Sequence, residues 1–331
     1  MAAARLPTPL EVRDLRTTLF TRRGEMKAVD GLSLSVGAGE TVALVGESGC
    51  GKSLSALSIM RLLPEPPARL IGGSVTLNGR DIVPLSEEDM LAIRGREIGM
   101  IFQDPMSSLN PVATVDKQIA EVLMAHTSLG RSQARLRAHE LLEQVGMPDA
   151  ARRLDAYPHQ LSGGMCQRVM IAMAIACSPS VLIADEPTTA LDVTVQAQVL
   201  ALLKTLQAEA GMAMIFITHD LGVVAETADR VVVMYAGRKV EEAAVDDLFE
   251  TPLHPYTAGL IGATPVPGGE RAARLADIPG MVPPLNELPK GCAFAARCPR
   301  VMARCRQERP ALTQPAPGRL VACFAAEQDA A

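Results

Sequence analysis

A glycine-rich stretch, GESGCGKS at residues 46–53, has the side chains and backbone freedom needed to bind a triphosphate. It follows an apolar run, TVALV, and precedes an apolar-periodic helix, the context that makes this pattern specific. The glycines let backbone N–H groups converge on phosphate oxygens. Lys52 can reach the β- and γ-phosphates, and the Ser53 hydroxyl can ligate Mg²⁺. The residues expected to contact the nucleotide here are Gly46, Glu47, Ser48, Gly49, Cys50, Gly51, Lys52, Ser53 and Leu54.

Two carboxylates follow a second apolar run. The stretch VLIADEP predicts a buried strand over residues 181–184 that leads into Asp185 and Glu186. In an open α/β sheet, carboxylates at the carboxyl end of a strand lie beside the phosphate loop. Asp185 is therefore predicted to hold the Mg²⁺ shell, and Glu186 to face the attacking water. Together with the glycine-rich loop, this pair predicts an ATPase.

A second anion-binding end is expected in the stretch LSGGMCQR. Ser162, Gly163 and Gly164 come just before a long apolar helix, so their N–H groups and the helix dipole favour an anion. One chain holds one γ-phosphate, yet this sequence carries two phosphate cradles. We therefore expect a dimer in which the second cradle closes over nucleotide bound to the partner.

Six ordered motifs resemble those of an ABC-type ATPase: GESGCGKS, the glutamine in MIFQDPMSSLNP, LSGGMCQR, VLIADEP, TALD and the histidine in ITHD. The resemblance covers about the first 250 residues. It implies an α/β fold of the P-loop NTPase type, with a RecA-like core, an antiparallel β subdomain and a helical subdomain at about residues 105–165. The cofactors implied are ATP and Mg²⁺.

The resemblance also implies roles for individual residues. Gln103 would sense Mg²⁺ and the water, Asp192 would act across the dimer, and His219 would contact the γ-phosphate. His219 also has a rationale of its own, because MAMIFITHD is a buried β-run that ends in a group able to donate to phosphate. The implied catalytic residues are Glu186, His219 and Gln103; the implied Mg²⁺ ligands are Ser53, Gln103 and Asp185; and the further nucleotide contacts are Ser162, Gly163, Gly164, Gln167 and Asp192.

Two positions depart from the family pattern. Cys166 stands in the signature where a basic residue or glutamine is common, so contacts across the dimer are expected to be weaker there. The aromatic residue that usually stacks on adenine aligns with Leu19, and we assign its role to the adjacent Phe20. Stacking of a base on an aromatic ring contributes roughly 1–3 kcal/mol.

Composition narrows the possible partners and the location. A net charge of −5 argues against a general nucleic-acid binder. The longest uncharged stretch, residues 169–184, is shorter than the roughly 18 apolar residues that a membrane helix needs. The first residues lack the charged and apolar regions of a secretory signal. We expect a peripheral protein at the cytoplasmic face of the cell membrane.

Residues 1–250 form the expected cassette, and residues 251–331 form a C-terminal extension that resembles one particular subfamily. LHPYTAGLIGATP, DIPGMVPPLNELPKGCAFAARCP and PGRLVACF are similar to the C-terminal extension of D-type ATPase subunits of oligopeptide, dipeptide and nickel permeases. Its residues 265–289 are rich in proline and glycine and are predicted to be a loop or linker.

Four cysteines in this extension suggest a metal centre. Cys292, Cys298, Cys305 and Cys323 are separated by 5, 6 and 17 residues. A short, proline-rich tail is a poor candidate for a core of its own, and a metal could stabilise it. No C-x2-C knuckle occurs, so wide spacing and the resemblance favour a 4Fe–4S cluster. Zinc and reduced thiols are the alternatives.

The function implied is that of the ATPase of an importer for dipeptides or oligopeptides. Its expected partners are a second, F-type ATPase subunit in a head-to-tail dimer, two transmembrane permease subunits and an external solute-binding protein. The alternatives are a homodimer, an importer of nickel or another small solute, and a soluble ABC ATPase acting on ribosomes or DNA. The last usually has tandem cassettes or a basic surface, which this chain lacks.

Overall fold

The computed structural model describes residues 8–22, 24–189, 191–264 and 278–329, and the chain forms two compact units. The first unit consists of residues up to 10, residues 36–40 and residues 76–216. The second consists of residues 11–35, 41–75 and 217–331. Among the described residues, no helix is both long and apolar enough to cross a membrane.

The first unit combines a small parallel sheet with a group of helices. Strands β6 (Ile98–Ile101) and β7 (Val181–Asp185) pair in parallel, from Ile98 opposite Val181 to Ile101 opposite Ala184. Because both strands are fully buried, they read as short apolar runs. The remaining strands of this unit are β5 (Arg80–Asp81), which pairs with the end of β4, and β8 (Ala213–Ile217), next to β7 in the sheet.

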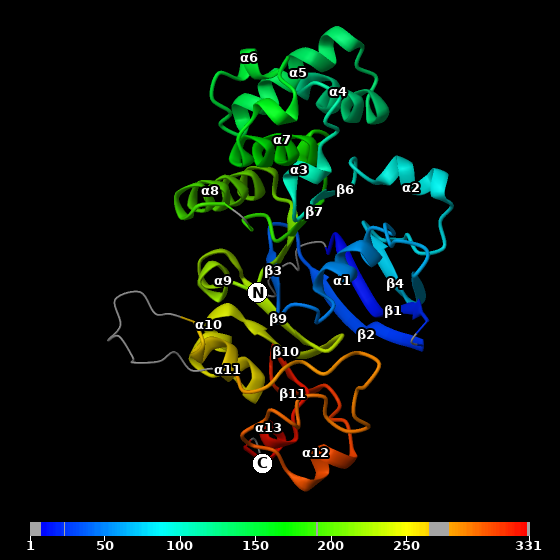
Figure 1. Cartoon of the computed structure of the whole chain (residues 1–331), viewed down its shortest axis with the longest axis vertical. Helices are drawn as coiled ribbons and strands as arrows, with labels where there is room; N and C mark the ends of the chain where they lie inside the picture. The colour runs from blue at the N-terminus through cyan, green and yellow to red at the C-terminus, as the bar shows by residue number, and fades with distance from the viewer. Residues whose placement is uncertain (1–7, 23, 190, 265–277, 330–331) are drawn as a thin grey trace, which may run out of the picture. The chain divides into compact units, whose positions relative to one another are not determined.

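Three of the helices of this unit pack against one another. Helices α4, α5 and α7 contact one another, and they lie together in green in Figure 1. Their packed residues include Ile119, Leu141 and Val169, all fully buried. The helices of the unit are α2 (Glu87–Ile93), α3 (Pro105–Ser108), α4 (Val115–His126), α5 (Arg131–Gln144), α6 (Ala150–Arg153), η1 (Pro158–Gln160), α7 (Gly163–Ile175) and α8 (Val193–Ala210). The helices expected near residues 105–165 are thus present, although the boundaries of that subdomain stay a prediction.

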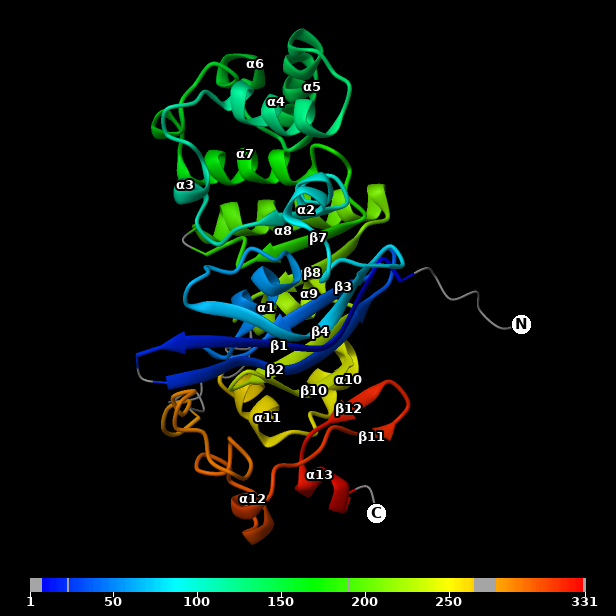
Figure 2. The same cartoon turned by 90° about the vertical axis from the view of Figure 1, so that its right-hand side faces the viewer.

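The second unit contains two sheets. One places β2 (Gly24–Val36), β1 (Leu10–Thr21) and β4 (Ala68–Leu77) side by side, as Figure 2 shows. The other has the order β11-β12-β10-β9-β3, in which β3 (Thr41–Val45) and β9 (Arg230–Tyr235) are parallel. Its helices are α1 (Lys52–Ile59), α9 (Leu221–Thr227), α10 (Val245–Glu250), α11 (Pro255–Gly262), α12 (Ala303–Gln307) and α13 (Phe324–Asp329).

The C-terminal extension adds strands to this second sheet. Strand β12 (Arg319–Val321) pairs antiparallel with β10 (Arg238–Ala244), with Val321 opposite Glu241, and β11 (Thr313–Ala316) pairs with β12. Part of the predicted linker, residues 265–277, lies outside the described residues. The extension is thus continuous with the sheet that also contains β3.

An aromatic cluster packs the extension against the strands. The ring centroid of Tyr235, at the end of β9, lies 4.7 Å from that of Tyr256 in α11 and 5.3 Å from that of Phe294. All three side chains are almost fully buried, and they belong to one hydrophobic core with Val231 and Val233. Edge-on aromatic contacts of this kind contribute about 0.5–1.5 kcal/mol beyond the area they bury.

Candidate nucleotide-binding site

The glycine-rich loop joins β3 to α1 in the second unit, as expected from the apolar runs on either side. Gly46, Gly49 and Gly51 have φ angles of 149°, 79° and 104°, in the region that only glycine adopts without strain. A Cβ at Gly46 would overlap the Met234 carbonyl, and one at Gly51 would overlap the Ala28 carbonyl. The glycines therefore let the loop backbone pass close to neighbouring segments in the conformation that turns N–H groups toward a phosphate.

Lys52, the first residue of α1, lies against this loop. It is 5% exposed, and its Nζ donates to the carbonyl oxygens of Gly46 at 2.7 Å and Glu47 at 3.1 Å. Its neighbour Cys50 is also buried, and that burial raises the pKa of the thiol. The cation is thus held over the loop, where a triphosphate would place its negative charge.

Glu47 in the same loop is held by residues of the C-terminal extension and of α11. The Arg297 guanidinium donates to both carboxylate oxygens of Glu47, at 2.6 and 2.9 Å. The backbone N–H of Glu47 donates to the Tyr256 hydroxyl at 2.8 Å. Hydrogen bonds to Glu47 raise the pKa of Arg297, whose side chain is 5% exposed. The sequence analysis missed both partners, because they lie more than two hundred residues away in segments without a recognised nucleotide motif.

In the first unit, the parallel pairing of β6 and β7 brings two predicted catalytic residues together. Gln103 follows β6 and Glu186 follows β7, and Gln103 Nε2 donates to Glu186 Oε2 at 2.8 Å. Thr189 Oγ1 donates to the same oxygen at 2.9 Å. Glu186 has a φ of 46°, which is strained for a residue with a side chain. Asp185, the last residue of β7, is 5% exposed.

The signature residues form the start of α7 in the first unit. Ser162 is the N-cap, and its side chain accepts a hydrogen bond from the Met165 N–H at 3.4 Å. A side chain at Gly164 would press against Val195, so a glycine allows the start of α7 to lie close to α8. Gly163 is exposed, with open space where a side chain would stand. The N-terminus of α7 therefore presents backbone N–H groups to solvent.

Cys166 and Gln167 of the signature were expected to make or modify contacts across a dimer, but both are buried. Cys166 is fully buried, and its thiol donates to the Pro158 carbonyl at 3.6 Å. Gln167 is 1% exposed, and its Nε2 has no hydrogen-bond partner within the part of the chain that the structure describes. The unusual cysteine thus faces the interior of its own helical unit.

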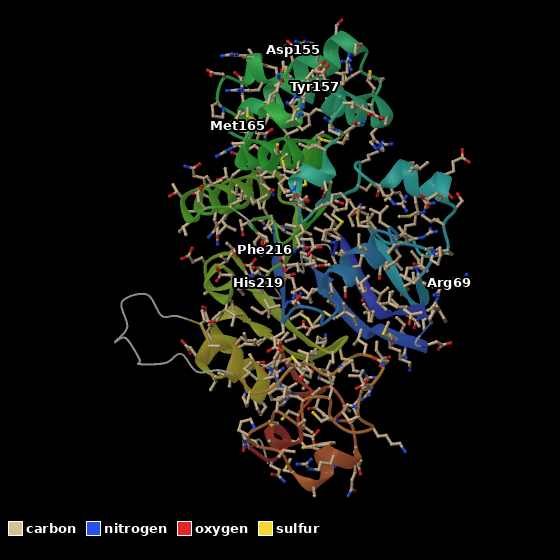
Figure 3. The ribbon with its side chains drawn as sticks, in the orientation of Figure 1. Arg69, Asp155, Tyr157, Met165, Phe216 and His219 are labelled. Atoms are coloured by element: carbon tan, nitrogen blue, oxygen red, sulfur yellow. The ribbon has the colours of Figure 1, made fainter. Side chains whose placement is uncertain are left out.

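Asp192 and His219 are both exposed, each in its own unit. Asp192 is the N-cap of α8, where its Oδ1 accepts from the Val195 N–H at 3.0 Å. His219 follows β8, as the apolar run predicts, and is labelled in Figure 3. The N–H of the preceding Thr218 donates to the Leu44 carbonyl of β3. This bond ties the segment of His219 to the strand that leads into the phosphate loop.

Phe20, assigned to adenine stacking, lies near the end of β1 in the second unit. Its side chain is 42% exposed. The Arg69 guanidinium lies 5.9 Å from its ring centroid, within the range of a cation–π contact. This exposure leaves room for a base to stack on the ring. No observation tests the assignment, which stays a prediction.

The predicted iron–sulfur cluster is wrong. Cys292, Cys298, Cys305 and Cys323 line one cavity of only about 10 Å³, the space of roughly one water molecule. Burial raises the pKa of Cys292 to about 11 and raises those of Cys298 and Cys323, which favours thiols over the thiolates that bind metal. Within the described ranges, no group of three or more His, Cys, Asp or Glu residues could hold a metal ion. None of the four cysteines is in a disulfide within the described residues.

Each unit, taken by itself, has residues of the types that bind the ATP and Mg²⁺ of an ABC ATPase. The glycine cradle and Lys52 offer donors to a triphosphate, and the hydroxyl and carboxylate oxygens of Ser53 and Asp185 are the hard ligands that Mg²⁺ prefers. Residues 29–189 match the ABC transporter family, and residues 240–305 match the family described as oligopeptide/dipeptide transporter, C-terminal region.

Comparisons with individual proteins extend the match to nearly the whole chain. The oligopeptide transport ATP-binding protein AppD of Bacillus subtilis is 52% identical over 98% of this chain and 99% of its own length. OppD of Salmonella typhimurium, also an oligopeptide transport ATP-binding protein, is 51% identical over 97% and 96%.

Among solved structures, a dimeric ATP-binding cassette, MJ0796, in a post-hydrolysis state with ADP and Pi is 28% identical. It matches with a TM-score of 0.65 over 71% of this chain and 98% of its own. This match confirms the P-loop ATPase fold expected from the motifs. The chain belongs to the ATP-binding proteins of ABC transporters, with an oligopeptide/dipeptide transporter C-terminal region.

Proposed function

We propose that this chain is the ATP-hydrolysing subunit of an ABC importer that takes up dipeptides or oligopeptides. The observation that carries the proposal is the C-terminal extension. It matches the oligopeptide/dipeptide transporter region over residues 240–305, and the similarity to the two oligopeptide transport ATP-binding proteins includes it. An ABC ATPase with another role would share the cassette, whereas the extension matches the family described as oligopeptide/dipeptide transporter, C-terminal region.

The residues that bind and orient the nucleotide follow from the motifs and from their local contacts. The phosphate loop and Lys52 bind the β- and γ-phosphates, and Phe20 stacks on the base. Ser53, Gln103 and Asp185 hold Mg²⁺, which supplies charge neutralisation for phosphoryl transfer.

Glu186 accepts a proton from the attacking water, and Gln103, hydrogen-bonded to it, orients the carboxylate. His219 donates to the γ-phosphate as negative charge develops there.

The second anion-binding end suggests that the active form is a dimer. The exposed start of α7, with Ser162, Gly163 and Gly164, would close over nucleotide held by the partner, and Asp192 would act across the same interface. The partner is an F-type subunit or, as the alternative, a second copy of this chain. Two permease subunits and an external solute-binding protein complete the importer, which places this subunit at the cytoplasmic face of the membrane.

The first test asks whether Glu186 is the base for ATP hydrolysis, independently of transport. Glu186→Gln should lower kcat for ATP by about 10²–10³ with little change in ATP binding, because it removes the base and leaves the phosphate loop intact. Glu209→Gln, an exposed change on α8, is the matched control. Activity unchanged by Glu186→Gln would contradict the assignment of the base.

The second test addresses the cargo. The chain should be reconstituted in proteoliposomes with its permease and second ATPase subunits and its solute-binding protein. We expect ATP-dependent uptake of a labelled tripeptide or pentapeptide that stops with Glu186→Gln. Uptake of nickel instead of peptide, or co-purification with ribosomes instead of membranes, would overturn the proposed function.

A further inference from the structure

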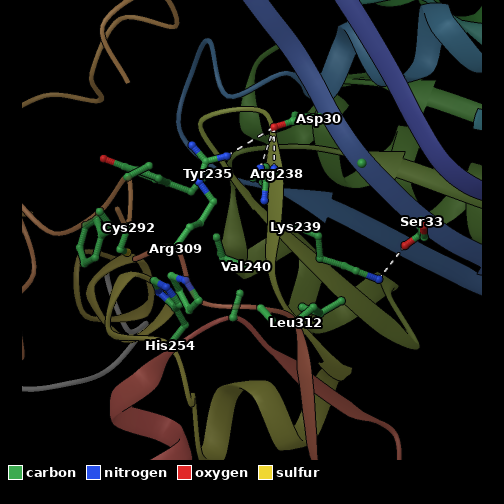
Figure 4. Close-up of a pocket in the computed structure, with 16 residues that line it drawn as sticks. Asp30, Ser33, Tyr235, Arg238, Lys239, Val240, His254, Cys292, Arg309 and Leu312 are labelled. Carbon is green, nitrogen blue, oxygen red and sulfur yellow. Dashed lines mark hydrogen bonds and ion pairs between the residues drawn. The ribbon is translucent and has the colours of Figure 1, made fainter. Parts of the chain in front are cut away.

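A cavity of about 170 Å³ lies between the cassette strands of the second unit and the C-terminal extension (Figure 4). None of the residues of the glycine-rich loop lines it. Its lining includes residues of β2, residues at the start of β10, and residues of the segments that precede and follow α12 in the chain. The volume is close to the roughly 150 Å³ of a cavity known to take a benzene molecule. The space therefore suits a ligand with about one ring or a branched side chain.

One wall of this cavity has more cations than anions. Asp30, whose side chain is 8% exposed, lies 2.7 Å from Arg238, 3.4 Å from Arg16 and 3.5 Å from Arg309. Arg16 lies outside the cavity lining and is also paired with Asp14 at 2.9 Å, so within the lining Asp30 faces the guanidinium groups of Arg238 and Arg309. Figure 4 shows Arg238 and Arg309 both directed toward Asp30. The next cation along β10, Lys239, is paired separately with Glu242 at 2.5 Å. Among the residues that line the cavity, the excess positive charge is therefore that of Arg238 and Arg309, which share the single carboxylate of Asp30.

Arg309 is the least satisfied of these arginines. Among the residues that the structure describes, its contact with Asp30 at 3.5 Å is its only ion pair, and its side chain makes no hydrogen bond. Its side chain is 32% exposed and lines the cavity, and a guanidinium group has five N–H donors to offer a ligand. Burial and the nearby charge of Arg238 lower its pKa. An anion in the cavity would relieve this repulsion and satisfy those donors.

The rest of the lining is apolar or neutral. The side chains of Val240, Phe294 and Leu312 form part of it. His254 also lines the cavity, and its burial lowers its pKa to about 4, so the ring is uncharged at neutral pH. A ligand that fits both walls needs an anionic head and an apolar body.

We propose that this cavity binds a small carboxylate with an aromatic or branched apolar body. The carboxylate lies on the Arg309 guanidinium in the two-pronged geometry that arginine forms with carboxylates. The apolar body packs against Phe294 and Val240. Because the ligand touches both β10 and the extension, its binding stabilises the contact between them.

The experiment uses benzoate as the probe and benzamide as its neutral analogue of the same shape. Binding to the full-length protein is measured by isothermal titration calorimetry with saturating Mg²⁺ and ADP, which keeps the nucleotide site filled. We expect benzoate to bind at least about tenfold more tightly than benzamide, because only benzoate makes charge-assisted hydrogen bonds. Equal binding of the two, or no benzoate binding up to about 10 mM, would overturn the proposal.

Two variants locate the site. Arg309→Gln should weaken benzoate binding about tenfold or more, whereas Arg306→Gln, an exposed change three residues away that does not line the cavity, should leave it within about twofold. Ala311→Leu, at an exposed lining position that tolerates a larger side chain, should block binding by filling the space and leave every charge in place. Benzoate binding that survives both Arg309→Gln and Ala311→Leu would show that it occurs elsewhere.

Discussion

At the scale of single residues, Glu47 is the unexpected member of the phosphate loop. A carboxylate there would repel a triphosphate, since two like charges about 4 Å apart repel each other by about 4 kcal/mol near a protein surface. Arg297 neutralises it with two hydrogen bonds, and the Tyr256 hydroxyl fixes the Glu47 backbone N–H. The extension therefore supplies the positive charge that is paired with the Glu47 carboxylate.

This pairing predicts a specific effect on nucleotide affinity. Arg297→Gln should raise KM for ATP about tenfold with a smaller change in kcat, because it leaves the Glu47 charge beside the phosphates. Glu47→Gln in the same chain should restore KM, and Arg297→Lys should restore part of it. Steady-state ATPase kinetics at two salt concentrations measure the changes in KM and kcat separately.

The matched control is Arg300→Gln, which removes an exposed ion pair with Asp329 in the same extension. If the double variant binds ATP as weakly as Arg297→Gln alone, Arg297 supports the loop through packing and not through its charge.

At the scale of elements, the turn from β3 to α1 depends on the close approach of two backbones. Gly51 and Gly79 both have positive φ angles, 104° and 83°. A Cβ at Gly51 would overlap the Ala28 carbonyl, whereas one at Gly79 would meet open space. Gly79→Ala should therefore lower the free energy of unfolding by about 1 kcal/mol through backbone strain alone, and Gly51→Ala by about 2–4 kcal/mol. Urea unfolding compares them, and equal losses would contradict the close approach.

Helix α11 begins at a buried histidine whose protonation state matters. His254 Nδ1 accepts a hydrogen bond from the Tyr256 N–H at 3.0 Å, which only the unprotonated nitrogen can do. Burial lowers the pKa of His254 to about 4, against about 6.5 when unfolded. The unfolded chain thus binds a proton that the folded chain does not, so stability falls as pH drops from about 6.5 toward 4.

This linkage predicts an acid-dependent loss of stability of about 2 kcal/mol between pH 7 and pH 5 from this one group. His254→Asn keeps a side-chain acceptor at the N-cap without a titrating ring, so its free energy of unfolding should change less over the same interval. Urea unfolding at the two pH values measures the difference in slope. Parallel slopes for the two proteins would assign the pH dependence to other groups.

The sequence predicted the local elements well and the long-range contacts poorly. The strands β3 and β7, the glycine turn and the helix α7 follow from apolar runs and turn residues a few positions apart. The partners of Glu47 do not, because Tyr256 and Arg297 reach it only through the packing of distant segments. The cysteine spacing misled for the same reason: intervals along a chain do not set the room between side chains, and the cavity that the four cysteines share is too small for a cluster.

At the scale of the whole molecule, the extension is part of the cassette's second unit and not a separate domain on a linker. Strand β12 continues the sheet through β10. Glu241 in β10 is fully buried, and both its oxygens accept backbone N–H groups, from Leu253 and His254. The Glu241 carboxylate thus links β10 to the turn before α11 through hydrogen bonds. Because the extension shares this sheet and these contacts, we expect the second unit to unfold in a single transition.

A charge introduced on β12 tests this cooperativity. Val321 is fully buried opposite Glu241, so Val321→Asp should destabilise the unit by about 3–5 kcal/mol by burying an unpaired charge beside a like one. Ala316→Asp, at an exposed position of β11, is the control. Calorimetry should show the unit melting earlier as a whole. A separate low-temperature transition for the extension, with the remainder unchanged, would contradict a shared core.

The contact between Arg297 and Glu47 has one more consequence, which follows from reciprocity. If the extension strengthens nucleotide binding by a given factor, nucleotide binding must strengthen the folded extension by the same factor. The stability of the C-terminal extension then depends on whether nucleotide is bound at the phosphate loop. Protection of the extension from proteolysis or hydrogen exchange should rise with nucleotide occupancy and lose that dependence when Arg297 and Glu47 are both replaced.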